Sequence, residues 1–438
     1  MEKDKKEDEK VAIVETIDKQ TLYNEIKNNK IANEQSEKFV RAIFENYFLD
    51  NDNINFLQKN GYNFFSFFDD ELCFCLSEKK YEDCCKLKLI NIVDKTYKTY
   101  EEILHKPEEY EKYLLSTFES FKNTFLKLAK LEKCNYPNCS EYANENRLYE
   151  INFDKKNLLS TNRLNPFDNI FKMGEDFFKK VSNENFKFYG LCNNHFNELR
   201  LITINSKTSD QEIIKIHIIA LLYKTFIGKV QLECLKEEFR KYFNSISDED
   251  YKALFVFRIK KLSSLVKSLL ENLKIYKTNF LENKDLKIIK LELETNKNMK
   301  LFDLMYPQVC PEDFSLVNSI NNIFVPERVA TINIANTDEI SLTTIVYNKK
   351  DERLEKFFNQ YLKILENKEK FIEAFVSNCA LILSDNILFD KSFYDKLENE
   401  NKLLYSALNK FRFENPNMGQ EYLKMKFFAG FNKGNNFF

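Results

Sequence analysis

The chain has 438 residues, of which 43% are hydrophobic and 15% aromatic, so it contains enough apolar side chains to bury a substantial core and is not globally disordered. Its 66 basic and 68 acidic residues leave a formal net charge of −2, which excludes attraction to nucleic acid or anionic membranes through an overall positive field. No stretch is apolar enough to predict a signal peptide or a membrane span, and we expect a soluble cytoplasmic protein.

The hydrophobic pattern predicts a mainly α chain with a small β-sheet (α+β) and two small zinc-stabilised modules. In chain order we predict a charged tail at 1–12, an N-terminal helical region at 13–70, a cysteine-rich knuckle at 71–90, a helix and a second cysteine-containing module at 95–205, a helical hairpin at 206–282 and an α+β region at 283–438.

Within these regions, three- and four-residue spacing of apolar side chains predicts helices, and alternation predicts strands. The predicted helices are 16–47, 97–133, 209–244, 249–281, 351–378 and 391–412, and the predicted strands are 286–294, 329–335, 340–347 and 380–383. Ser247 or Asp248 is the expected N-cap of the second hairpin helix.

The first cysteine cluster lies in LCFCLSEKKYEDCC and has the spacing CxCx8CC. It comprises Cys73, Cys75, Cys84 and Cys85. In a reducing compartment such cysteines are metal ligands or free thiols rather than disulfides, and two closely spaced pairs suit a closed tetrahedral zinc site. Four buried thiols and an iron–sulfur cluster are the alternatives.

This segment resembles the SEC-C motif, a short zinc knuckle found at the end of the preprotein translocase ATPase and on many other proteins. The resemblance includes the ligand spacing and the run of Lys79, Lys80 and Tyr81 before the second pair. Leu76 and Glu78 stand where the family usually has glycine. The resemblance implies zinc and a docking surface rather than a catalyst.

The second cluster combines a Cx4C knuckle in KCNYPNCSEY with a CxxH pair in FYGLCNNHFNELR. Its candidate ligands are Cys134, Cys139, Cys192 and His195. Four such ligands complete a zinc site, and a CxxH pair that opens a helix after a knuckle and a hairpin is typical of a treble-clef finger. In the alternative interpretation, His195 is an ordinary surface histidine.

This arrangement is similar to the finger of a little-characterised bacterial family that also carries a SEC-C knuckle and whose finger is similar to those of HNH nucleases. Where that family usually has a Ser-His pair, this chain has Asn146 and Arg147, and Phe196 replaces the aspartate after the final histidine. The resemblance implies a degenerate HNH-like finger, in the setting of phage defence.

HNH chemistry needs a histidine base that activates water. The chain has three histidines, and if His195 is a ligand, His105 and His217 are left. His217 lies in the apolar run IIKIHIIALL, which favours a packed core position, and Arg147 cannot act as a base at neutral pH. We therefore predict no catalytic residues and expect binding rather than catalysis.

Three lysines recur every seven residues opposite the apolar face of the helix predicted at 249–281. They are Lys260, Lys267 and Lys274. Together with Arg147 they are candidate nucleic-acid contacts, although a simple solvated face explains the same pattern.

The sequence thus predicts a protein with two zinc ions per chain that binds a protein partner or nucleic acid, without distinguishing between the two and without indicating an oligomeric state. The alternative is a metal-dependent HNH-like nuclease with a degenerate active site, in which Arg147 and a nearby acid such as Glu145 or Glu150 replace the usual histidine.

Overall fold

The computed structural model describes residues 67–89, 119–149, 158–160, 178–181, 186–242, 249–294, 299–307, 310–313, 315, 317–318, 328–336, 340–366, 372–381, 383–396 and 402. The predicted tail at 1–12, the helix predicted at 16–47, the N-cap predicted at Ser247 or Asp248, His105 and most of the helix predicted at 391–412 lie outside these residues.

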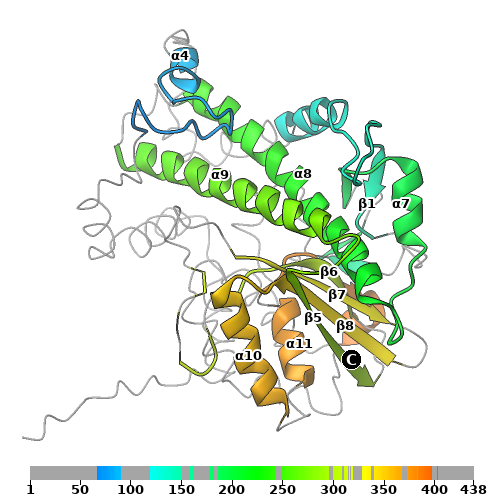
Figure 1. Ribbon diagram of the computed structural model, residues 1–438. Coiled ribbons are helices and arrows are strands. Elements are labelled where there is room, and N and C mark those ends of the chain that lie inside the picture. The colour runs from blue at the N-terminus through cyan, green and yellow to red at the C-terminus, as the bar shows by residue number, and fades with distance from the viewer. Residues whose placement is uncertain are drawn as a thin grey trace, which may run out of the picture.

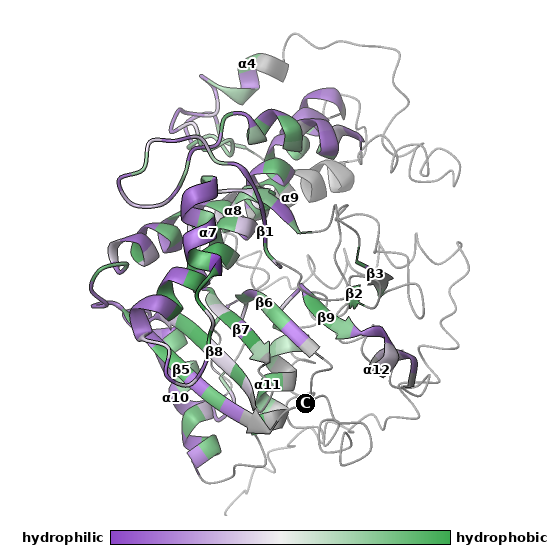
Figure 2. Ribbon diagram, turned by 90° about the vertical axis from the view of Figure 1, so that its right-hand side faces the viewer, coloured by the Kyte–Doolittle hydropathy of each residue, from purple (hydrophilic) through white to green (hydrophobic). Residues whose placement is uncertain are grey.

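The centre of the fold is an antiparallel sheet with seven described strands in the order β3-β2-β9-β6-β7-β8-β5 (Figure 2). Its strands are β2 (Leu158–Ser160), β3 (Lys179–Lys180), β5 (Leu286–Glu294), β6 (Met299–Met305), β7 (Ala330–Asn336), β8 (Ile340–Asn348) and β9 (Ile387–Asp390). Every neighbouring pair is antiparallel, and β5 pairs with β8 from Leu286 opposite Asn348 to Glu294 opposite Ile340.

Strand composition follows position in the sheet. Residues 341–347 of β8 are all buried, as expected for a β-branched strand covered on both faces. The edge strand β5 instead alternates, with Ile289 and Leu291 buried and Lys290 and Glu292 exposed. Charged side chains on an edge strand discourage pairing with other chains.

One face of the sheet is covered by two long antiparallel helices, α8 (Asp210–Tyr242) and α9 (Glu249–Thr278) (Figure 1). A capping box begins α8, because the Ser209 N–H donates to Glu212 Oε2 at 3.0 Å and the Glu212 N–H donates to Ser209 Oγ at 3.3 Å. Gly228 permits the close helix contact, since a Cβ there would lie 2.9 Å from Val266 Cγ2.

The opposite face is covered by α10 (Glu352–Glu366) and α11 (Ile372–Leu381) (Figure 1). Asp351 caps α10 by accepting the Arg353 and Leu354 N–H groups at 3.1 Å. The buried side chains of α10 recur at helical spacing: Leu354, Phe357, Phe358, Tyr361 and Leu365. They pack on the sheet, where Tyr347 stacks on Phe358 with ring centroids 4.3 Å apart.

The sheet therefore separates two hydrophobic cores. One lies between the sheet and α10 and α11, and includes Ile332, Tyr347 and Phe357. The other lies under α8 and α9 and continues without interruption into the segment that carries the second cluster, where Phe188 and Leu191 are fully buried.

The predicted α+β class, the helical hairpin and three of the four predicted strands are confirmed. The strand predicted at 380–383 is wrong, because α11 continues to Leu381, and the short strand that follows it is β9. The single helix predicted at 351–378 is described as α10 and α11, and the helix predicted at 97–133 is helical over residues 119–129 of its described part.

The sequence also failed to predict β6, and it gave no sign that β2 and β3 join the sheet. These two short strands come from the insertion between Cys139 and Cys192, and β2 pairs with β9 through Leu159 opposite Phe389. Among the described helices, none combines the length and apolarity needed to cross a bilayer.

Candidate metal centres

The four thiols of the first cluster come together as the spacing predicted, with all four sulfur atoms within 4.8 Å of one another. The Cys73 N–H donates to the Lys79 carbonyl at 2.8 Å, and Leu72 and Lys80 form an antiparallel bridge that closes the loop. The second pair lies where α4 (Cys85–Leu89) begins. Sulfur atoms bound to one tetrahedral ion at about 2.3 Å are about 3.8 Å apart, so this donor set fits a metal.

Two residues of the loop between the cysteine pairs occupy the left-handed region of backbone space. Leu76 has φ 61° and Glu78 has φ 60°. These are the two positions at which the SEC-C resemblance leads one to expect glycine, and an L-residue with a Cβ is strained there. The loop thus adopts a left-handed backbone conformation at two positions where its own side chains disfavour it.

The pKa values of the thiols in the first cluster are shifted because four sulfur atoms lie close together. A hydrogen bond from Cys85 lowers the pKa of Cys73 to about 5, and the same bond, followed by burial, raises the pKa of Cys85. Burial raises the pKa of Cys75. Several thiolates cannot share so small a volume without a cation, and a divalent metal is the usual one.

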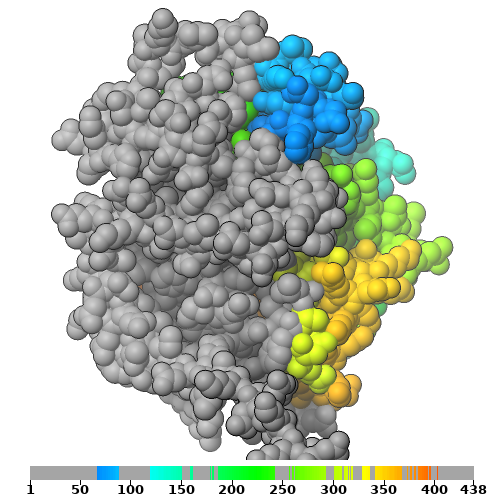
Figure 3. All heavy atoms as spheres, turned by 90° about the vertical axis from the view of Figure 1, so that its left-hand side faces the viewer, coloured from blue at the N-terminus to red at the C-terminus, as the bar shows by residue number. Residues whose placement is uncertain are grey.

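The first cluster is docked on the far end of the α8/α9 hairpin rather than on the sheet (Figure 1). The rings of Phe67 and Phe74 each lie 5.4 Å from the ring of Phe239 on α8. Lys260 of α9 pairs with Glu71 at 2.9 Å, and its ammonium lies 5.1 Å from the Phe67 ring. Figure 3 shows this segment, in blue, at the surface of the molecule.

The second cluster also comes together, with all four ligand atoms within 4.8 Å of one another. The knuckle bends around Asn138, which has φ 62°, and the Cys134 N–H donates to the Glu141 carbonyl at 2.8 Å. Cys192 is the N-cap of α7 (Asn193–Arg200), and His195 lies in the first turn of that helix. Its Nδ1 faces two sulfurs, at 3.1 Å from Cys192 and 3.5 Å from Cys134.

Two strands link the knuckle to the helix. They are β1 (Glu145–Arg147) and β4 (Lys187–Tyr189), which pair antiparallel with Asn146 opposite Phe188. The order is therefore knuckle, strand pair and helix, as the sequence predicted, with β2 and β3 inserted between β1 and β4.

Tyr136 holds the histidine of the second cluster in place. Its ring stacks on the His195 imidazole, with centroids 3.9 Å apart and planes inclined by 7°, and its hydroxyl donates to Glu198 Oε1 at 2.9 Å. Outer contacts of this kind fix the orientation of metal ligands. Sequence reasoning missed this role, although the tyrosine stands inside the Cx4C knuckle.

The two residues that replace the Ser-His pair have different environments. Asn146 is fully buried, and its Oδ1 accepts the N–H groups of Gly190 and Leu191 at 3.2 and 2.9 Å. Arg147 is partly exposed and donates to Glu145 at 3.2 Å. Asn146 therefore holds β1 against the turn before Cys192, and Arg147 reaches the surface.

The remaining candidates are one histidine and three lysines of the helical hairpin. His217 is fully buried, as predicted. Lys260 is bound to Glu71, whereas Lys267 and Lys274 are exposed on α9. The contact of these lysines and of Arg147 with nucleic acid stays a prediction.

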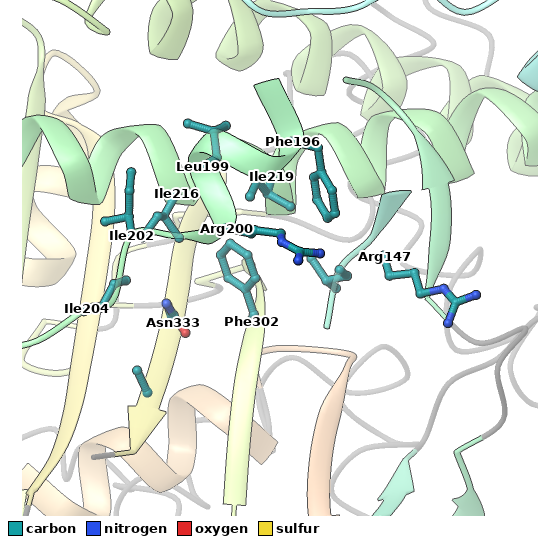
Figure 4. A pocket seen from close by; sticks show the side chains of 12 residues that line it. Arg147, Phe196, Leu199, Arg200, Ile202, Ile204, Ile216, Ile219, Phe302 and Asn333 are labelled. Carbon is teal, nitrogen blue, oxygen red and sulfur yellow. The ribbon is translucent and has the colours of Figure 1, made fainter. Parts of the chain in front are cut away.

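A pocket of about 210 Å³ opens between the finger, α8 and the sheet (Figure 4). Apolar side chains form most of its wall, including Phe196 from α7 and Phe302 from β6. Arg200, at the end of α7, runs between these two rings, Asn333 of β7 lies across from them, and Arg147 stands at the rim with its guanidinium pointing away. Sequence reasoning found Arg147 but missed Arg200, because nothing in the local pattern links α7 to β6 and β7.

No protein family, curated protein or solved structure matches this chain. The resemblances to the SEC-C knuckle and to an HNH-like finger therefore rest on the residues quoted above. What the structure gives is two clusters of four side chains, each arranged so that it could bind one metal ion.

Proposed function

We propose that this protein is a zinc-stabilised binding protein of the cytoplasm, in which two zinc ions hold the fold and the surface of a degenerate HNH-like treble clef binds nucleic acid. The first ion is held by the four thiolates of the first cluster and the second by three thiolates and Nδ1 of His195. Four protein ligands make each a closed structural site, and such an ion supplies folding energy rather than an activated water.

The observation that carries the proposal is the pair Asn146 and Arg147, which stands where the finger that this chain resembles has Ser-His. Asn146 takes the place of the serine, as a buried amide whose oxygen is engaged by two backbone N–H groups, and Arg147 takes the place of the histidine base. The neighbouring Arg147 keeps a positive charge at the surface without offering a base. This combination supports recognition of phosphate rather than its hydrolysis.

The alternative is a metal-dependent nuclease in which Arg147 and a nearby acid replace the histidine. Glu145 is the acid nearest in sequence, and it is engaged by both Arg147 and Lys187, at 3.2 and 3.3 Å. Arg147 binds the Oε1 atom of this carboxylate and Lys187 binds the Oε2 atom, so each oxygen already has a cation as its partner, which favours the binding proposal. A protein partner and the phage-defence setting, which rests on the resemblance alone, stay predictions.

The test incubates the purified protein with plasmid DNA and RNA in the presence of Mg²⁺ or Mn²⁺. We expect both substrates to stay intact, a mobility shift that weakens steeply with salt, and about two zinc ions per chain by elemental analysis. Metal-dependent cutting that disappears in Arg147→Ala would establish the nuclease instead. Purification without chelator that yields no zinc would contradict the structural role of the clusters.

A further inference from the structure

Four lysines lie on the outer side of the helix that leads into the second cluster. This helix covers residues 119–129 (cyan in Figure 1), and its inner side buries Phe121 and packs Phe125 against Phe226 of α8, with ring centroids 5.0 Å apart. Its other side is exposed, as are most residues of the turn that follows. The lysines of this exposed stretch are Lys122, Lys127, Lys130 and Lys133.

The charges of these lysines are not neutralised by neighbouring carboxylates. Among the residues that the structure describes, none of the four lysines takes part in an ion pair. Glu132, the acid that stands between two of them in the chain, is bound instead to Lys229 of α8 at 2.9 Å. The exposed acids Glu119 and Glu141 lie at the two ends of this stretch, and the lysines outnumber them. The charge complement of such a surface is a polyanion.

Large apolar side chains are exposed next to these lysines. Leu126, Leu131 and Tyr142 are 50%, 66% and 63% exposed. Lys133 pairs with Tyr142 in an isolated antiparallel bridge, and its ammonium lies 5.9 Å from the centre of the tyrosine ring. Surfaces that bind single-stranded nucleic acids combine these two features, because bases stack on exposed rings while phosphates contact the cations.

We propose that the four lysines and Tyr142, which we call the lysine face, bind a single-stranded nucleic acid. The ammonium groups contact its phosphates, and an unstacked base lies against the Tyr142 ring. The inference deepens the proposed function and rests on it. Phosphate contacts make the affinity depend on salt, and stacking tolerates any base because every base has a flat face. A duplex keeps its bases stacked on one another, so it can use only the lysines of this face.

The experiment measures binding of a short fluorescent oligonucleotide, single-stranded or in a duplex, by anisotropy at several salt concentrations. Lys130→Gln with Lys133→Gln should weaken single-strand binding and lower the slope of log affinity against log salt by about 1.4, since each phosphate contact contributes about 0.7. The matched control is Lys349→Gln with Lys363→Gln, which removes two exposed lysines from the α10 side of the sheet and should leave the slope unchanged.

Tyr142→Ala tests the base contact separately from the phosphate contacts. It should weaken single-strand binding by about fivefold or more, because it removes the stacking surface, and it should leave duplex binding unchanged. Tyr142→Phe, which keeps the ring, should restore single-strand binding. Zinc content and Tm show that each variant is folded. Lys122→Gln with Lys127→Gln, farther along the chain from the metal ligands, replaces the first lysine pair if that variant loses zinc.

The outcomes are distinct. A smaller salt slope in the lysine variant, with a loss in Tyr142→Ala that is confined to the single strand, supports the lysine face. Equal competition by poly-glutamate, a polyanion without bases, would mean an acidic protein partner and overturn it, as would a Tyr142→Ala variant that binds single strand and duplex as wild type does. Nucleic-acid binding that none of these variants changes overturns the lysine face and leaves the proposed function in place, and no binding to any nucleic acid overturns both.

Discussion

His217 is the polar centre of the core between α8 and the sheet. Its Nδ1 lies 2.7 Å from the Thr331 hydroxyl and its Nε2 lies 2.8 Å from the Thr344 hydroxyl, so both ring nitrogens have partners. The Tyr276 hydroxyl lies 2.9 Å from the same Thr331 oxygen and donates to the Val346 carbonyl. These hydrogen bonds satisfy a neutral imidazole, and the hydroxyls offer no counter-charge to an imidazolium.

Burial therefore lowers the pKa of His217 to about 3, from an ordinary value of 6.5. Between these values the unfolded chain binds a proton that the folded chain does not, so the free energy of unfolding rises with pH across this window. The stabilising contribution is complete above pH 6.5 and is lost as the pH falls toward 3. Each pH unit within the window changes the free energy of unfolding by roughly 1.4 kcal/mol.

We predict that His217→Gln removes this pH dependence. At neutral pH the variant should be less stable by about 1–3 kcal/mol, because glutamine does not fully reproduce the hydrogen bonds of the buried imidazole. Between about pH 7 and about pH 5 wild type should lose roughly 2 kcal/mol relative to the variant, so the two curves converge. Urea unfolding at several pH values measures this, and a gap that stays constant with pH would show that His217 does not sense the proton.

The turn between the cysteine pairs of the first cluster stores backbone strain. The sequence predicted the ligands from their spacing, and the resemblance marked Leu76 and Glu78 as departures from glycine. The structure gives these departures a physical meaning, because both residues have φ close to +60°. A residue with a Cβ in the left-handed region costs about 1–2 kcal/mol of strain. Glycine relieves this strain, but it loses more conformational entropy on folding, which offsets part of the gain.

We predict that Leu76→Gly strengthens metal binding at the first cluster by about fivefold, equivalent to about 1 kcal/mol, because glycine adopts this backbone without strain. Glu78→Gly should act in the same direction. Leu76→Ala is the matched control: it removes the same side-chain contacts but keeps the Cβ, and should give no gain. Competition with a chromophoric chelator measures the affinity, and an equal effect of glycine and alanine would contradict the strain.

At the scale of elements, the sequence predicted the features that depend on residues close together in the chain and missed those that depend on distant ones. The hairpin helices and the strands β5, β7 and β8 were predictable because their periodicity is local, and the ligands of both clusters because metal binding needs particular residues at short spacing. The strand prediction at 380–383 was wrong because the apolar run around Ala380 is part of a buried helix. The hydrophobic periodicity of a short apolar run does not distinguish a buried helix from a buried strand. The contacts of Glu71 with Lys260 and of Phe302 with the finger join segments that only the tertiary fold brings together.

At the scale of the whole molecule, the two metal centres have unequal connections to the core. The second cluster is continuous with the core beneath α8, since Cys192, Phe188 and Leu199 are buried in it. The first cluster is held at the tip of the helical hairpin by the aromatic contacts with Phe239 and by the ion pair of Lys260. Loss of a metal should therefore have local consequences at one centre and global consequences at the other.

We predict that Cys84→Ser with Cys85→Ser removes one zinc ion and lowers Tm by less than about 4 °C, because the tip can open while the sheet stays folded. Cys134→Ser with Cys139→Ser removes the other ion and should lower Tm by more than about 10 °C, since a structural zinc site contributes several kcal/mol to the fold that contains it. Elemental analysis and thermal unfolding measure both effects.

Hydrogen exchange locates the change in each double variant. In the first, faster exchange should be confined to residues 67–89 and the end of α8 around Phe239; in the second, it should extend through α7 into α8 and the sheet. Each pair of substitutions replaces two thiols with two hydroxyls, so the difference between them comes from position in the fold rather than from chemistry. Equal losses of Tm would contradict the unequal connection of the two centres to the core. Protection of α7 that survives loss of the second ion would mean that the finger does not depend on its metal and that the core alone holds it.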